Sequence, residues 1–316
     1  MKTTAEAAAW LRQRDHFLIL THRRPDGDTI GSAAALCLGL RQMGKQAELF
    51  PNEQFGAKFL PLLDGLIGSA DETGKTVVSV DLASEGLLPY HGEHLAGRTE
   101  LAIDHHGSND RTAGQSLILP EAAACGEIIL NLLDDLGVGL TRAIADALYV
   151  AISTDTGRFA YSNTTADTFR AAARCAEAGA DLFSWNRILF SVKSMGRRNL
   201  ESYLTQHVAF YAGGKVALCI LPQSVADGFG VTEDDLDDIS SFPRDFDGVE
   251  IGVMIRDVAE GAKISLRSLD QWDSSAICQT MGGGGHRAAA GATVDGTLED
   301  GKAAVLSALR QAGVEV

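Results

Sequence analysis

Short apolar runs rich in β-branched residues alternate with longer helical patterns through the first half of the chain. The strand-like runs are FLIL (17–20), TVVSV (76–80) and LAI (101–103). The helical patterns cover residues 29–44, 125–137, 141–153 and 165–180. Strands that alternate with helices usually pair in parallel, and the helices cover the sheet. The alternation therefore predicts an α/β domain with a mostly parallel sheet flanked by helices.

The second half of the chain has a different pattern. Strand-like runs at 208–221, 249–258 and 262–268 are separated by glycine or acidic turns, and a helical pattern at 298–313 follows them. This order suits a smaller α+β domain, with the acidic run at 232–240 as a solvated helix face. The predicted boundaries are 1–184 for the first domain, 185–207 for a helical connector and 208–316 for the second domain.

Composition argues against three classes of protein. The net charge of -15 argues against long duplex DNA as a partner, because gripping it requires a basic face. No apolar run reaches the ~18 residues of a membrane span, and the first residues suit an amphipathic helix better than a signal peptide. The five cysteines lie far apart and form no C-x-x-C pair, so we expect core residues and not disulfides or zinc ligands. We therefore expect a cytoplasmic protein with no membrane contact.

The segment THRRPDGD (21–28) lies between the first strand-like run and a helical pattern. Ligands of open parallel sheets gather at the carboxyl ends of strands, so His22, Asp26 and Asp28 lie where a site is expected. The same residues also fit a purely structural role, since Pro-Asp-Gly is common in turns and Asp28 suits a helix N-cap. This segment alone leaves both interpretations open.

Three further segments place ionisable side chains at the ends of strands or helices. Asp81 follows TVVSV, the triplet Asp104-His105-His106 follows LAI, and Asp155 ends a long helical pattern. A single aspartate at such a place serves equally well as a loop cap, but adjacent histidines after a buried strand fit that interpretation less well. Because four segments point to one edge of one sheet, we expect a common site. Carboxylates and imidazoles without thiolates suit Mn²⁺ or Mg²⁺.

These segments resemble the four N-terminal motifs of the DHH phosphoesterase superfamily. The matching residues are HRRPDGD (22–28), Asp81, DHH (104–106) and TDTG (154–157). A later run, MGGGGHRAAAGA (281–292), resembles the glycine-rich signature of the DHHA1 domain that follows in many members. The resemblance covers nearly the whole length of the chain.

The resemblance implies a role for each matching residue. Two divalent metal ions are implied, Mn²⁺ first and Mg²⁺ as the alternative, with Asp81 as the bridge. The implied metal ligands are His22, Asp26, Asp28, Asp81, His105 and Asp155. His106 would face the scissile phosphate, and Asp104 would orient a neighbouring imidazole. The implied substrate-binding residues are Arg267, Gly283, Gly284, Gly285, His286 and Arg287, for which a flexible loop and a plain surface arginine are the alternatives.

A substrate held at one phosphate by the second domain and cut at another by the first must be short. The resemblance therefore implies a metal-dependent phosphoesterase of the nanoRNase/pAp-phosphatase branch. Such an enzyme hydrolyses short single-stranded RNA or DNA oligonucleotides to nucleoside 5'-monophosphates, or 3'-phosphoadenosine 5'-phosphate (pAp) to AMP. Hydrolysis of linear or cyclic dinucleotides (pApA, cyclic di-AMP) is the nearest alternative, and a non-catalytic nucleotide-binding regulator is the third. The polarity, 3'-5' or 5'-3', and the oligomeric state, including a homodimer, stay open.

Overall fold

The computed structural model describes residues 1, 3–236, 238–269 and 271–316. The chain divides into two compact units, Met1–Val192 and Lys193–Val316, each with its own sheet and hydrophobic core. The division falls inside the stretch predicted as a helical connector. That stretch is not one helix, because α6 (Leu182–Asn186) and a π-helical turn (Arg187–Ser191) end before α7 (Met195–His207) begins.

The first unit contains a five-stranded sheet in the order β2-β1-β3-β4-β5, and all neighbouring strands are parallel. Its three inner strands are the predicted ones, and the two short outer strands were not predicted. The bounds are β1 (Phe17–Leu20), β2 (Ala47–Leu49), β3 (Thr76–Val80), β4 (Leu101–Asp104) and β5 (Gln115–Ile118). The prediction of a mostly parallel sheet is confirmed.

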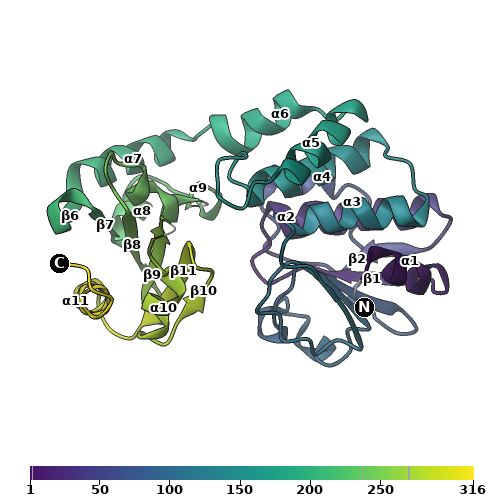
Figure 1. Ribbon diagram of the computed structural model, residues 1–316, viewed down its shortest axis with the longest axis horizontal. Coiled ribbons are helices and arrows are strands. Elements are labelled where there is room, and N and C mark those ends of the chain that lie inside the picture. Colours follow the sequence, from purple (N-terminus) through teal and green to yellow (C-terminus); the bar gives the residue numbers. More distant parts are fainter. Residues whose placement is uncertain (2, 237, 270) are drawn as a thin grey trace. The chain divides into compact units, whose positions relative to one another are not determined.

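Helices cover one face of this sheet, and loops cover the other (Figure 1). On the helical face, α2 and α3 lie on the sheet, α1 packs against α3, and α4 packs against α2 and α5. On the other face, a smaller core joins Leu18 and Val77 to loop residues such as Phe50 and Leu95. The helices are α1 (Thr4–Arg12), α2 (Gly27–Gln42), α3 (Cys125–Leu136), α4 (Arg142–Asp155) and α5 (Ala166–Glu177).

Glycines let α2 and α4 approach closely. A Cβ atom on Gly31 would lie 2.3 Å from the carbonyl oxygen of Ala147, so only glycine fits between these two backbones. At the start of α2, a Cβ atom on Gly27 would lie 2.4 Å from Oγ1 of Thr154. The N-terminus of α2 therefore lies beside the C-terminus of α4, where Asp155 is the last residue.

The second unit contains a six-stranded sheet in the order β10-β11-β9-β8-β7-β6, in which β7 and β8 are parallel and all other neighbours are antiparallel. Helices α10 and α11 pack on one face, and α7, α8 and a 3-10 helix pack on the other, so the predicted α+β class is confirmed. The bounds are β6 (Ala209–Tyr211), β7 (Val216–Leu221), β8 (Ile251–Val258), β9 (Gly261–Ser268), β10 (Gly284–Gly285), β11 (Ala289–Val294), α8 (Gln223–Gly228), α9 (Glu233–Leu236), the 3-10 helix Ile239–Asp245, α10 (Ser274–Gln279) and α11 (Leu298–Gln311).

Two sequence expectations for this unit need correction. The run at 208–221 is not one strand but two antiparallel strands, because Gly213 and Gly214 adopt φ of 65° and 96° in the turn between them. The acidic run at 232–240 holds only the short helix α9 and the start of a 3-10 helix, and Asp237 lies outside the described residues.

All five cysteines are buried and unpaired, which confirms their assignment as core residues. Within the described part of the chain, no helix combines the length and the apolar character that a membrane crossing requires.

Candidate metal centre

The predicted site residues follow the carboxyl ends of adjacent parallel strands. His22 follows β1, Asp81 follows β3 directly, and Asp104 is the last residue of β4. Because β1, β3 and β4 are neighbours in the sheet, their carboxyl ends meet at one edge. Asp155 reaches the same place from the end of α4.

The structure brings the side chains of all six predicted metal ligands together. The Nε2 atom of His22 lies 3.7 Å from Asp26 Oδ1 and 4.0 Å from Asp81 Oδ2. The Nε2 atom of His105 lies 3.5 Å from Asp81 Oδ1, 3.9 Å from Asp28 Oδ2 and 3.6 Å from Asp155 Oδ2. Potential ligand atoms therefore form three overlapping groups. One consists of His22, Asp26 and Asp81, a second consists of Asp28, His105 and Asp155, and a third consists of Asp81, Asp104, His105 and His106.

Asp81 belongs to the first and the third of these groups, and it has an unusual conformation. Its φ of 53° is in the left-handed region, which costs most residues roughly 1 kcal/mol or more but which aspartate tolerates better than most. The Asp81 N–H donates to the carbonyl oxygen of Ile103 (2.9 Å), which fixes the backbone against β4. The side chain is buried, and its Oδ1 atom lies 3.3 Å from His106 Nδ1 and 3.5 Å from His105 Nε2 but accepts no hydrogen bond from either. A buried carboxylate oxygen without a donor is costly, so the site fits a cation at this position.

Asp26 and Asp28 have different roles in helix capping. The N-cap of α2 is Asp26, which accepts hydrogen bonds from the N–H groups of Asp28 (3.0 Å) and Thr29 (3.2 Å). The sequence had suggested Asp28 as the alternative N-cap, and this was wrong. Asp28 instead accepts from the first N–H groups of α3, at Cys125 (2.6 Å) and Gly126 (2.9 Å). These hydrogen bonds tie the start of α2 to the start of α3 and fix the Asp28 carboxylate.

Burial of several carboxyl groups together changes their ionisation. Burial and the neighbouring Asp81 and Asp26 raise the pKa of Asp28 well above its usual range. Burial and Asp28 raise the pKa of Asp155 in the same way, although His105 opposes the shift. Ionised, these groups repel one another, and divalent cations would offset that repulsion. The cluster is therefore able to hold divalent metal.

The two histidines of the DHH triplet are oriented by different acceptors. His105 Nδ1 donates to the carbonyl oxygen of Ala122 (3.1 Å), which leaves the Nε2 lone pair facing the carboxylates. His106 Nδ1 donates to Asp104 Oδ1 (2.8 Å). Burial lowers the pKa of His106, but its hydrogen bond to Asp104 and the nearby carboxylate of Asp81 outweigh this effect and raise the pKa to about 11.

Asn109 belongs to the site and was not predicted from the sequence. Its Nδ2 atom donates to Asp104 Oδ2 (2.7 Å) and to the carbonyl oxygen of Leu82 (3.0 Å). The side chain is buried, and it links the loop after β3 to the loop after β4. The only signal in the sequence was a polar residue shortly after the DHH triplet, in a segment that also reads as an ordinary turn.

The predicted substrate-binding residues lie in the second unit, around a short hairpin. The glycine-rich run is not an open loop, because β10 pairs with β11 and a Cβ atom on Gly283 would lie 2.1 Å from the carbonyl oxygen of Gly291. His286 and Ala289 exchange both backbone hydrogen bonds (2.8 and 3.2 Å). The adjacent pair, Gly285 and Ala290, is therefore non-hydrogen-bonded, and the Gly285 N–H points to the sheet edge.

The two predicted arginines flank this hairpin. Arg267 on β9 pairs with Ala289 in register, and its guanidinium donates to Ser240 Oγ (2.9 Å) and to the carbonyl oxygen of Leu266 (2.9 Å). The exposed side chain of Arg287 lies 3.6 Å from Asp273 Oδ2. Both guanidinium groups therefore have protein partners that a ligand would join or replace.

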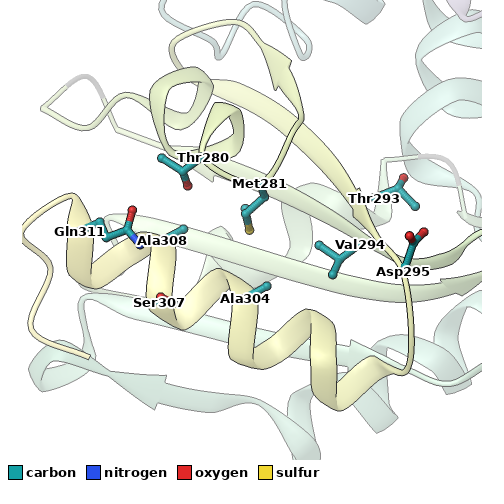
Figure 2. Close-up of a pocket in the computed structure, with 9 residues that line it drawn as sticks. All are labelled: Thr280, Met281, Thr293, Val294, Asp295, Ala304, Ser307, Ala308 and Gln311. Carbon is teal, nitrogen blue, oxygen red and sulfur yellow. The ribbon is translucent and has the colours of Figure 1, made fainter.

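The second unit also has a hollow of about 530 Å³ that sequence reasoning gave no reason to expect. Met281, Val294 and small side chains of α11, including Ala304 and Ala308, line this hollow (Figure 2). None of the predicted site residues lines it.

Comparison with known proteins identifies the family. Residues 16–152 match the DHH family, N-terminal domain, and residues 213–313 match the DHHA1 domain. The chain is 34% identical to the bifunctional oligoribonuclease and PAP phosphatase NrnA of Thermus thermophilus, over 93% of this chain and 89% of that protein. It is 24% identical to NrnA of Bacillus subtilis, over 89% of this chain and 90% of that protein. An exopolyphosphatase-related protein from Bacteroides fragilis has the same fold, with a TM-score of 0.87 at 21% identity over 98% of this chain and 95% of that one. The chain therefore belongs to the DHH family, in the group that carries a DHHA1 domain and includes the NrnA proteins.

Proposed function

We propose that this protein is a two-metal phosphoesterase that hydrolyses short oligonucleotides to nucleoside 5'-monophosphates and pAp to AMP. The activities named for its NrnA relatives support the substrate class, since the chain matches one of them at 34% identity over most of its length. The convergence of six ligand side chains, with the buried Asp81 carboxylate among them, is the observation that best supports the reaction type.

In this proposal, His22, Asp26 and Asp81 hold one divalent ion, and Asp28, Asp81, His105 and Asp155 hold the other. Mn²⁺ is the proposed metal, because two imidazoles among carboxylates favour it over Mg²⁺. When bound, the ions would activate water and offset negative charge on the phosphoryl oxygens.

His106 would act as a proton donor toward the substrate. The Asp104 carboxylate accepts from Nδ1 and raises the pKa of His106, which favours a ring with both nitrogens protonated. The Nε2–H group is then the one that would donate to a phosphoryl oxygen or to the leaving oxygen. Asp104, buried and held by Asn109, would fix the ring in that orientation.

Replacing Asn109 by alanine tests whether Asn109 holds Asp104, and through it the His106 ring, in place. The Asp104 Oδ2 atom and the Leu82 carbonyl oxygen both lose a buried donor, so we expect kcat to fall by about 10- to 100-fold. KM should change little, because Asn109 would touch no substrate atom. Steady-state kinetics on pApA measure both constants, with Asn131→Ala on the exposed side of α3 as the matched control. An unchanged kcat for Asn109→Ala would contradict the positioning role.

In the second unit, Arg267, His286, Arg287 and the hairpin glycines would bind a phosphate that is not cleaved. The Gly285 N–H at the sheet edge and the exposed Arg287 would supply donors of the kind that phosphate oxygens accept. A second phosphate contact would favour substrates with more than one phosphate, such as pApA and pAp.

The function is tested with purified protein, Mn²⁺ and labelled RNAs of two to ten nucleotides, alongside pAp, ApA and cyclic di-AMP. We expect nucleoside 5'-monophosphates from the short RNAs and AMP from pAp. Faster cleavage of cyclic di-AMP than of any linear substrate would favour a cyclic dinucleotide phosphodiesterase instead. No hydrolysis of any of these substrates would overturn the proposal and favour a nucleotide-binding regulator.

A further inference from the structure

Three consecutive residues directly after the metal centre adopt left-handed backbone conformations. Gly157, Arg158 and Phe159 have φ of 53°, 62° and 64°, and they follow Asp155 at the end of α4. Such conformations are uncommon for residues other than glycine, and two in succession are rarer still. The Arg158 N–H donates to the carbonyl oxygen of Ser153 (2.8 Å), which closes the turn onto α4. The strain fixes where the Arg158 side chain leaves the backbone.

Aromatic rings hold this turn from both sides. The ring of Phe159 stacks on Phe169, with centroids 5.5 Å apart, and lies 6.2 Å from the ring of Tyr149. The ring of Tyr161 covers Gly157, where a Cβ atom would lie 2.3 Å from Cζ of the tyrosine. These aromatic contacts therefore restrain the conformation of the turn.

Arg158 has no anionic partner among the described residues. Some other arginines of the first unit form ion pairs, as Arg174 does with both carboxylate oxygens of Asp134 (2.7 and 2.6 Å). The exposed Arg158 instead places its guanidinium carbon 5.3 Å from the ring centroid of Phe190. The guanidinium therefore packs against an aromatic ring and not against a carboxylate.

We propose that Arg158 is a substrate-binding residue that receives a phosphate neighbouring the one that is hydrolysed, and that Phe190 is its positioning residue. The inference rests on the proposed function, and it adds a phosphate subsite within the first unit. A planar guanidinium matches two phosphate oxygens at once, which lysine does not. The aromatic face restrains the guanidinium through a cation–π contact and leaves its N–H groups for the ligand.

The test uses substrates that differ only in the neighbouring phosphate. The pairs are pApA with ApA, and pAp with 3'-AMP. Arg158→Asn is the informative variant, because asparagine tolerates a left-handed backbone and removes the charge. We expect KM for pApA and pAp to rise by about tenfold or more, while KM for ApA and 3'-AMP changes by less than about twofold. We also expect kcat and the melting temperature to stay near the wild-type values.

Companion variants separate charge, geometry and folding. Arg158→Lys should restore part of the loss, and Phe190→Leu should give a smaller rise in KM for the same two substrates. Arg170→Asn, on exposed α5, is the matched control and should behave as wild type. Equal effects of Arg158→Asn on both members of each pair, or no effect on any, would overturn the inference while wild-type activity stands. Wild-type protein inactive on all four substrates would instead overturn the proposed function.

Discussion

Replacing Asp81 by asparagine is expected to lower kcat/KM for pApA by at least about a thousandfold, equal to ~4 kcal/mol of transition-state stabilisation. The buried Asp81 carboxylate lies 4.0 Å from His22 Nε2 and 3.5 Å from His105 Nε2, so it adjoins ligands of both proposed ions. Asparagine has the same shape and tolerates the positive φ at this position, so the change removes charge without forcing the backbone to move. Initial rates in Mn²⁺ measure the loss.

Folding is checked in the same samples by thermal unfolding in the presence of a chelator. We expect the melting temperature of Asp81→Asn to equal or exceed that of the wild type, because one of several crowded carboxylates is gone. Asp64→Asn, at an exposed loop position, is the matched control and should keep full activity. Wild-type rates in Asp81→Asn would remove Asp81 from the metal centre and contradict the two-metal proposal.

The parallel sheet was predictable because its inner strands are buried on both faces. Such strands read as continuous apolar runs, as FLIL does in β1 and TVVSV does in β3. The strand β11 was not predictable, because its sequence AAGATV has little intrinsic strand preference. It forms because β9 pairs with its whole length, which only the folded unit provides.

The convergence of the candidate site followed from topology alone. Once parallel strands are placed side by side, residues at their carboxyl ends share an edge, and this brought His22, Asp81 and Asp104 together. The contacts that orient these side chains were not predictable. Asp28 accepts from Cys125 and Gly126 of a distant helix, and Asn109 joins two loops, so both depend on tertiary packing that no local pattern records.

Removing the metal is expected to destabilise the first unit as well as to abolish activity. A ligand that binds only the folded state at 100 times its Kd adds about 2.7 kcal/mol to the free energy of unfolding. For a unit of this size, that corresponds to a rise in melting temperature of roughly 5–10 °C on adding Mn²⁺ to chelator-treated protein. Differential scanning calorimetry measures the shift, and titration calorimetry should give two ions per chain.

The variants make this experiment a test of the individual ligands and not only of metal dependence. Asp81→Asn should lose most of the Mn²⁺-induced shift, because in the proposal each of the two ions would lose a ligand. His22→Ala should keep part of it, since the group formed by Asp28, His105 and Asp155 stays intact. Asp64→Asn should show the full shift. Two outcomes would contradict the proposal: a single ion bound per wild-type chain, or equal losses of the Mn²⁺-induced shift in the His22 and Asp81 variants. In either case, Asp81 would be an ordinary ligand and not a ligand shared by two ions.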